Sequence, residues 1–177
     1  MNDLPSLPLT PVQFLRHAVE PALALLPAAM STDRARLMLV AIALQESGLA
    51  SRWQIIDPQR PELKGPARGL LQFERGGGVR GVLMHEASQE YARWVCSMRV
   101  VAPTVSAVYA ALEHDDVLAA AFGRLLLWTD PRALPAVGDE PGAWALYLRC
   151  WRPGKPRPAK WADCYRAAVA TVREADA

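Results

Sequence analysis

The sequence predicts a single domain built mainly from α-helices. Ala, Leu, Arg and Glu, which favour helix, dominate the chain, and no long stretch alternates between apolar and polar residues as a strand does. The chain has 177 residues, 51% of them hydrophobic and 21% charged, which suits one domain with a substantial core. Because no internal repeat and no linker divides the chain, we expect residues 1–177 to form one unit.

The first helix is expected to begin near Thr10. Pro11 would lie in its first turn, where the missing backbone N–H of proline needs no partner. Pro21 would kink or end the helix. Its buried face would carry the apolar residues Val12, Leu15, Ala18 and Val19.

The second helix is expected to extend from Ser31 or Thr32 to about Ser47. Ser and Thr are favoured N-cap residues, and Gly48 is well placed to terminate the helix. The centre of this helix, residues 37–44, is apolar on every face. Such a helix is typically the buried central helix of a globular domain.

The character of the chain changes between Gly48 and Gly81. Prolines and glycines are frequent here, including the run from Gly76 to Gly78, and they predict a loop-rich segment. We expect a small loop or hairpin from about Ser51 to Val82, in which the glycine run forms a flexible loop beside the functional groove. The helical pattern returns over residues 88–99, 105–112 and 117–127, and after a Pro-rich loop over residues 152–158 the last helix covers residues 159–174.

Composition excludes several classes of protein. A net charge of +2, from 20 basic and 18 acidic side chains, is too small to indicate a nucleic-acid-binding protein. No run reaches the roughly 20 apolar residues that span a bilayer. The three cysteines, Cys96, Cys150 and Cys164, leave one unpaired and lack metal-finger spacing, so we expect free thiols.

Glu46 is the first candidate functional residue. It lies at the end of the apolar second helix and shares a face with Leu39, Ile42 and Ala43. An apolar wall and the C-terminal end of a helix dipole both disfavour ionisation of a carboxylate, so its pKa should rise toward neutrality. Glu46 is therefore a candidate general acid. The alternative is an ordinary solvated glutamate at a helix end.

A second motif, Gly65-Pro-Ala-Arg-Gly-Leu-Leu-Gln-Phe73, follows in the loop-rich segment. Gly69 permits a tight turn, and Gln72 can donate to and accept from amides and hydroxyls. Taken alone, the motif indicates only a turn and a short strand. Together, Glu46-Ser47 and this motif resemble the Glu-Ser and Gly-Ala-x-Gly-Leu-Met-Gln pair of the soluble lytic transglycosylases, a family of the lysozyme-like superfamily.

The resemblance implies a lysozyme-like helical lobe with a groove that binds peptidoglycan glycan strands. It implies that Glu46 is the catalytic acid and that no metal or organic cofactor takes part. Ser47, Gly69, Leu70, Leu71, Gln72 and Phe73 would belong to the substrate-binding segment, with Leu70, Leu71 and Gln72 lining the sugar sites. The resemblance covers about 30 residues of the 177.

The sequence departs from the family in several places. Pro66 stands where a small residue is usual, and Leu71 stands where methionine is common. The downstream Ala-Tyr-Asn-Ala-Gly motif is absent, and the nearest candidate begins at Ala145. In that candidate, Tyr147 would hold the position of the family tyrosine that hydrogen-bonds the catalytic glutamate, and Trp151 would be a platform on which a sugar stacks. The alternative places both aromatic residues in the core.

The number of carboxylates separates two mechanisms. Hydrolysing glycosidases generally need two carboxylates, whereas a transglycosylase uses one glutamate as acid and then as base. In hydrolytic lysozymes of this superfamily a second acid often lies just before the glycine turn, whereas Pro66-Ala67-Arg68 precedes Gly69 here. In this respect the chain resembles the transglycosylases, which implies their reaction and its 1,6-anhydro product. Glu74, Asp57 and Glu62 remain possible second acids of a hydrolytic lysozyme, Glu74 above all because it follows Gln72-Phe73 directly.

Other motifs carry weaker signals. The segment from Gly76 to Gly81 matches GxGxxG but lacks the surrounding βαβ unit of a dinucleotide site. His85-Glu86 and His114-Asp115-Asp116 lack zinc-ligand spacing and are read as solvated helix termini, so no metal site is expected. Positive charge near the proposed site comes from Arg68, Arg75 and Arg80, which would meet stem-peptide carboxylates or lie exposed.

The N-terminus begins Met-Asn-Asp-Leu-Pro, without the basic and apolar regions of a secretory signal. We therefore expect synthesis in the bacterial cytoplasm and action on the cell wall through a phage lysis pore (a holin context) or carriage in a virion. A monomer is expected. The competing hypothesis is a non-catalytic lysozyme-like module that binds glycan or serves as a structural part of a phage, and the presence of Glu46 argues against it.

Overall fold

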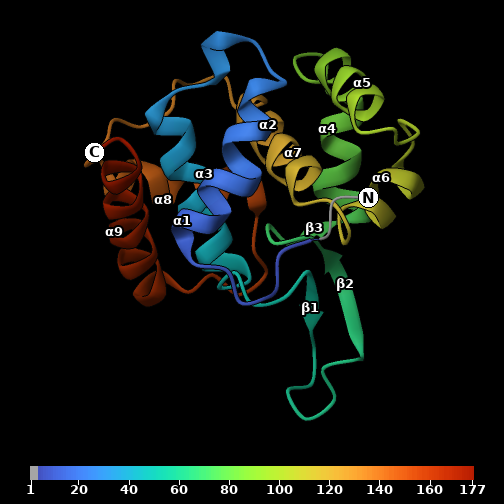
Figure 1. Cartoon of the computed structure of the whole chain (residues 1–177), viewed down its shortest axis with the longest axis horizontal. Coiled ribbons are helices and arrows are strands. Elements are labelled where there is room, and N and C mark those ends of the chain that lie inside the picture. Colours follow the sequence, from blue (N-terminus) through green and yellow to red (C-terminus); the bar gives the residue numbers. More distant parts are fainter. Residues whose placement is uncertain (1–3) are drawn as a thin grey trace.

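The computed structural model describes residues 4–177 and has a mainly helical architecture with a small antiparallel sheet (Figure 1). The helices are α1 Pro11–Phe14, α2 Glu20–Ala24, α3 Asp33–Glu46, α4 Arg80–Met84, α5 Gln89–Met98, α6 Val105–Ala111, α7 Asp116–Trp128, α8 Glu140–Trp151 and α9 Pro158–Ala175. The strands are β1 Trp53–Ile55, β2 Lys64–Arg68 and β3 Phe73–Glu74. Within the described residues, no helix is long and apolar enough to cross a bilayer.

Helix α3 is the buried centre of the helical body, as its apolar sequence predicts. All of its residues from Leu37 to Ala43 are buried, and α9 packs along one side of it (Figure 1). Thr32 caps its start by accepting a hydrogen bond from the backbone N–H of Ala35. Gly48, at φ +61°, takes the left-handed conformation just after its end. The predicted termini of this helix are confirmed to within a residue.

The first helical segment continues past the predicted break. Thr10 caps α1 with Pro11 in the first turn, and the segment reaches the end of α2 through a π-helical turn over Leu15–Val19. The widened turn lies immediately before Pro21, whose missing N–H and bulky ring oppose regular α-helix. Pro21 therefore coincides with a distortion of the helix and does not end it.

The sheet follows α3 and has the order β1-β2-β3, all antiparallel. Arg68 of β2 lies opposite both Trp53 and Phe73. The end of the β1–β2 hairpin projects away from the helical body, whereas β3 lies against it (Figure 1). The expected hairpin is thus present, with a short third strand added to it.

The prediction of a flexible loop at the glycine run, Gly76 to Gly78, is wrong. Residues Arg75–Val79 form a π-helical turn that leads directly into α4. Val79, Val82 and Leu83 are buried and supply an apolar face, which outweighs the poor helix propensity of glycine. Gly78 also has a packing role, because a Cβ at this position would lie 2.6 Å from the ring of Phe73.

The later helices agree with the sequence except for α8. Helices α5, α6, α7 and α9 match their predicted ranges closely. The missed helix α8 carries Pro141 and Gly142 in its first turn, residues that suggest a turn when read locally. Asp139 caps it by accepting from the N–H of Gly142, and its buried face packs toward α7 and α9. Proline is compatible with a first turn, so the helix forms.

Candidate functional site

A cleft of about 420 Å³ opens at the C-terminal end of α3. One wall consists of sheet residues, the second of the end of α8 and the loop that leads to α9. Its lining includes Glu46, Ser51, Trp53, Gln54, Gln72, Phe73, Glu74, Trp151, Arg152 and Arg157. The cleft therefore brings together three segments that are far apart in the sequence.

Glu46, the last residue of α3, is half-buried and lines this cleft. Burial raises the pKa of its carboxyl group above the ordinary value. A hydrogen bond from Tyr147 and the charges of Lys160 and Arg157 oppose this rise, while the charge of Glu74 adds to it. The net result is a carboxyl group that keeps its proton to higher pH than a solvated glutamate.

Tyr147 of α8 donates a hydrogen bond from its hydroxyl to Oε1 of Glu46 at 2.6 Å. The contact is the one that the resemblance implied for this tyrosine. Its ring is buried and stacks on Trp161 at a centroid distance of 5.2 Å, with Trp144 at 5.2 Å. Burial and the neighbouring carboxylate hold the pKa of Tyr147 far above its usual range, so the hydroxyl remains a donor. Tyr147 is thus both a core residue and the partner of Glu46.

Ser47 and Gly69 fix the backbone next to the cleft. The Ser47 hydroxyl lies 2.7 Å from the carbonyl of Leu70 and accepts from the N–H of Leu49, so it ties the end of α3 to the turn before β3. Gly69, at φ +73°, is buried, and a Cβ there would lie 3.0 Å from the carbonyl oxygen of Leu112. Both residues act on the backbone that carries Gln72.

Leu70 and Leu71 do not line the cleft, contrary to the expectation. Both side chains are fully buried in the hydrophobic core. The tight turn at Gly69 directs these two apolar side chains into the helical body, where burial is favourable. What the pair offers to the site is backbone, since the carbonyl of Leu71 accepts from the indole N–H of Trp151 at 2.9 Å.

Gln72, Phe73 and Trp151 do line the cleft. Gln72 has a positive φ of 53° and donates from Nε2 to the carbonyl of Gly69 at 2.9 Å. The ring of Phe73 is buried and lies 5.8 Å from that of Trp151, which is half-buried. With its N–H engaged by Leu71, the Trp151 indole is held in one orientation at the wall of the cleft.

Among the possible second acids, only Glu74 lies on this cleft. It is exposed on β3 and close enough to raise the pKa of Glu46. Asp57 and Glu62 lie in the projecting hairpin between β1 and β2, away from the cleft lining. Asp57 instead pairs with Arg60 at 2.9 Å, and this ion pair lowers the pKa of its carboxyl group. The structure therefore leaves Asp57 without a place in the site.

Two basic residues that lie near Glu46, Arg157 and Lys160, were not among the site residues predicted from the sequence. Arg157 lines the cleft, and its carbonyl accepts from Nε2 of Gln45 at 3.1 Å. Lys160 donates from Nζ to the carbonyls of Leu44 and Gln45 at 2.7 and 2.8 Å, so it caps the end of α3. A cap supplied from more than a hundred residues away leaves no local pattern in the sequence.

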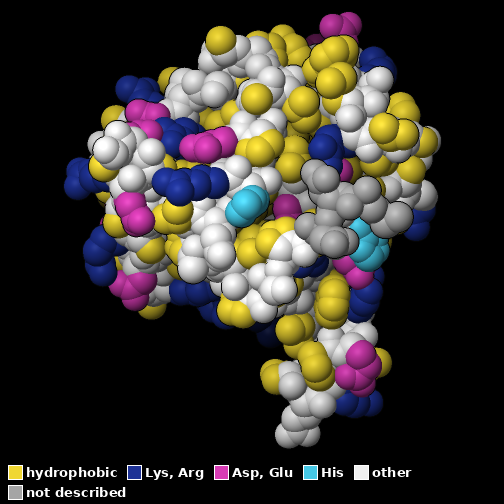
Figure 2. Space-filling view, in the orientation of Figure 1, with side chains coloured by type: hydrophobic (Ala, Val, Ile, Leu, Met, Phe, Trp, Pro, Cys, Tyr) yellow, Lys and Arg dark blue, Asp and Glu magenta, His cyan; other side chains and the backbone are white. Residues whose placement is uncertain are grey.

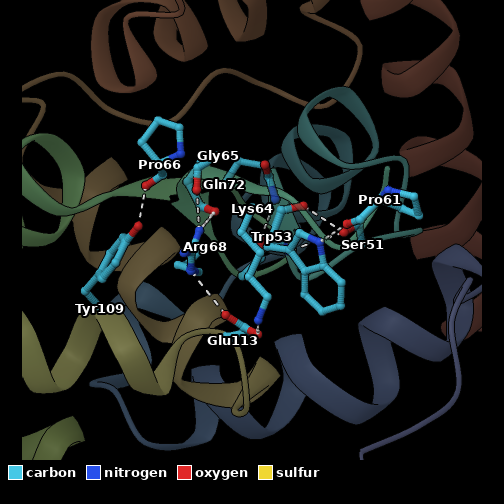
Figure 3. Close-up of polar contacts among 12 residues, drawn as sticks. Ser51, Trp53, Pro61, Lys64, Gly65, Pro66, Arg68, Gln72, Tyr109 and Glu113 are labelled. Carbon is cyan, nitrogen blue, oxygen red and sulfur yellow. Dashed lines mark hydrogen bonds and ion pairs between the residues drawn. The ribbon is translucent and has the colours of Figure 1, made fainter. Parts of the chain in front are cut away.

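The sheet wall of the cleft is fixed by a polar network (Figure 3). The indole N–H of Trp53 donates to the carbonyl of Pro61, and Lys64 and Arg68 both pair with Glu113 between α6 and α7. The Tyr109 hydroxyl donates to the carbonyl of Pro66. The sequence left it open whether Arg68, Arg75 and Arg80 face the substrate or lie exposed. Arg68 pairs with Glu113 and does not line the cleft, Arg75 donates to the hydroxyl of Ser106, and Arg80 is exposed.

The prediction that residues 114–116 form a solvated helix terminus is wrong for Asp116. Asp115 caps α7 by accepting from the N–H of Leu118, as a helix terminus should. Asp116 is buried and forms a two-bond ion pair with the guanidinium of Arg52, at 2.7 and 2.8 Å. Within residues 4–177 no cluster of His, Cys, Asp and Glu is arranged to hold a metal ion.

The charged side chains on the face shown in Figure 2 are interspersed, with Lys and Arg next to Asp and Glu.

No family model, curated protein or solved structure matches this chain.

Proposed function

We propose that this protein cleaves the β-1,4 bond between N-acetylmuramic acid and N-acetylglucosamine in peptidoglycan, as a lytic transglycosylase. The observation that carries the proposal is the Glu46 carboxyl group, half-buried in the cleft, with a raised pKa and a hydrogen bond from Tyr147. Such a group keeps its proton to higher pH than a solvated glutamate and can deliver it to a leaving oxygen. The sequence resemblance of Glu46-Ser47 and of the Gly65–Phe73 segment to this family supports the same chemistry.

The reaction would use Glu46 twice. Protonated Glu46 gives its proton to the glycosidic oxygen, and the bond from that oxygen to C1 of the muramic acid breaks. The resulting carboxylate takes the proton of the C6 hydroxyl of the same sugar, and O6 forms a bond to C1. The products are a 1,6-anhydro ring and a free hydroxyl on the departing sugar, and Glu46 regains its proton. Attack within one sugar gains the advantage of a tethered nucleophile.

Tyr147 would assist both steps. Its hydroxyl occupies Oε1 of Glu46, which leaves Oε2 to carry the transferred proton. A donor on the carboxylate also stabilises the charge that Glu46 acquires between the steps. Trp151 and Gln72 on the cleft walls offer an aromatic face and an amide, groups suited to sugar rings and to N-acetyl groups.

A hydrolytic lysozyme is the second candidate, and the position of Glu74 favours it. Glu74 is the one carboxylate besides Glu46 that lines the cleft within the described part of the chain. Hydrolysis would need it as nucleophile or as the base that activates water. The distinction is one of product, because hydrolysis leaves a reducing end where transglycosylation leaves an anhydro ring.

The test is digestion of purified Gram-negative peptidoglycan by the wild type, Glu46→Gln and Glu74→Gln, with mass spectrometry of the soluble fragments. The proposal predicts anhydro-muropeptides from the wild type and Glu74→Gln and none from Glu46→Gln. Reducing-end fragments that vanish with Glu74→Gln would establish the hydrolase. If no form releases fragments while the wild type binds the polymer, the protein is a non-catalytic glycan-binding module.

The route to the cell wall belongs to the same proposal. A phage or prophage enzyme would reach peptidoglycan through a lysis pore or inside the virion. Mass spectrometry of purified virions checks the second route, which requires the protein to be present in them.

A further inference from the structure

A second pocket of about 420 Å³ lies on another part of the molecule, and none of its lining residues lines the Glu46 cleft. It is formed by the end of α7, the segment that follows it to Leu134, and the residues just before and within the start of α3. Trp128, Pro131 and Leu134 supply apolar surface, and three arginines, Arg34, Arg124 and Arg132, also line it. The size is typical of a pocket for a small organic molecule.

Arg124 is the unusual residue of this pocket. It is 2% exposed, and its Nε donates to the carbonyl of Met30 at 2.8 Å. Its guanidinium lies 5.0 Å from the ring centroid of Trp128. Its Nη1 is buried with no hydrogen-bond partner, and no carboxylate within residues 4–177 forms an ion pair with it.

A buried guanidinium without a counter-ion is a costly arrangement. Burial lowers the pKa of Arg124 to about 10, which shows how strongly this environment disfavours the charge. Buried charges in proteins are as a rule paired, and buried donors are as a rule hydrogen-bonded. The carbonyl of Met30 and the face of Trp128 compensate only part of the lost hydration.

The charges around the pocket are unbalanced. Arg34 and Arg132 are exposed at its rim, and Arg34 contacts the carbonyl of Leu134. Asp130 is the only acidic residue of the lining among residues 4–177. Arg149 holds its carboxylate at 2.7 Å from outside the pocket, and the carboxylate also accepts from the backbone N–H of Arg132 at 3.1 Å. The positive charge of the three lining arginines therefore lacks an equal negative charge.

We propose that this pocket binds a small organic anion. The carboxylate or phosphate oxygens of the ligand accept hydrogen bonds from Arg124 and from the rim arginines, and its apolar part packs against Trp128 and Leu134. An oxyanion is the natural partner of a guanidinium, whose planar donors match its geometry. The bound anion supplies the negative charge that no residue from 4 to 177 places beside Arg124.

The experiment measures thermal unfolding of the whole purified chain against ligand concentration, at constant ionic strength set with sodium chloride. The probes are benzoate and phenyl phosphate, with benzamide and inorganic phosphate as matched compounds that lack the charge or the ring. We expect a saturable rise of the unfolding temperature with benzoate, phenyl phosphate or both, and none with benzamide. The tighter of the two ring-bearing anions identifies carboxylate or phosphate as the preferred group.

Arg124→Met should weaken binding at least about tenfold, as expected for the loss of hydrogen bonds to a charged group. Arg166→Met, at an exposed position of α9, should leave binding unchanged. If Arg124→Met does not fold, Arg132→Gln at the exposed rim decides, with a loss of about threefold or more expected. The proposal is overturned if no anion stabilises the wild type saturably, or if the folded variants at 124 or 132 bind the anion as the wild type does.

Discussion

The hydroxyl of Tyr147 lies 2.6 Å from Oε1 of Glu46 and joins the middle of α8 to the end of α3, across 101 residues of sequence. The hydroxyl is locked as a donor, because burial and the carboxylate raise the pKa of Tyr147. Glu46 meanwhile carries a raised pKa of its own, caused above all by burial. The pair therefore combines a carboxyl group whose ionisation is disfavoured with a hydroxyl donor that stabilises the carboxylate once it forms.

Glu46→Gln should lower the rate of peptidoglycan cleavage by about 10²-fold or more, because general acid catalysis contributes about 10²–10⁴-fold. The same change should stabilise the protein at neutral pH. Since the pKa of Glu46 is raised on folding, the folded state binds its proton more tightly, and stability is lost as pH rises from the ordinary value of 4.5 through the folded pKa.

The check for Glu46→Gln is urea unfolding of both proteins at pH 4 and pH 7.5. The difference between the free energy of unfolding of the variant and that of the wild type should increase in favour of the variant as the pH rises. An equal difference at both pH values would contradict a raised pKa for Glu46.

Tyr147→Phe should lower kcat/KM about tenfold, the scale expected for one hydrogen bond to a charged group. Because the hydroxyl stabilises the carboxylate, its loss should raise the pKa of Glu46 further and move the alkaline limb of the pH profile to higher pH. Tyr165→Phe is the matched control, since Tyr165 belongs to the same aromatic cluster but accepts from the N–H of Gly138. A similar shift of the limb in Tyr165→Phe would show that the effect comes from packing.

Lys160→Met should destabilise the protein by about 1–3 kcal/mol, because two carbonyls at the end of α3 lose a charged donor. It should also raise the pKa of Glu46, which Lys160 lowers by its charge. Lys155→Met, at an exposed position of the α8–α9 loop, should change neither property. Urea unfolding and the pH profile of cleavage measure the two effects, and an unchanged alkaline limb in Lys160→Met would argue against the electrostatic link.

Asp116→Asn should lower the free energy of unfolding by about 3–5 kcal/mol, because it leaves the buried guanidinium of Arg52 without its counter-ion. Asp163→Asn breaks the exposed pair with Arg166 and should cost at most about 1 kcal/mol. Chemical unfolding of both variants measures the contrast. Equal effects of the two substitutions would mean that the Arg52–Asp116 pair adds little to holding β1 against α7.

Features that depend on a few neighbouring residues could be predicted from the sequence. The cap at Thr32, the apolar centre of α3 and the terminating Gly48 all act within one or two helical turns, and their helix was predicted accurately. Glu46 was singled out because it ends that apolar helix. Local sequence signals do not predict the structure where they conflict with packing. Gly76–Gly78 favour a loop by their propensity, but they lie in a π-helical turn.

The orientation of apolar side chains could not be predicted in the same way. Leu70 and Leu71 follow a turn, and a turn does not determine which of its side chains face a groove and which face the core. Their burial depends on α3 and α7 lying beneath them, where Gly123 makes room for the side chain of Leu71. The two leucines were therefore expected at sugar sites and were found in the core.

The sequence by itself determined the mainly helical character, the ends of α3 and the position of the Glu46 carboxylate at the C-terminus of that helix. These depend on propensity, periodicity and capping, which operate between residues close in the chain. Only the tertiary structure decided that Tyr147 donates to Glu46, that Lys160 caps α3 from α9, and that Arg124 is buried with no counter-ion in the described part of the chain. These contacts join residues far apart in the chain, and their partners are selected by the packing of whole helices, which no local pattern encodes.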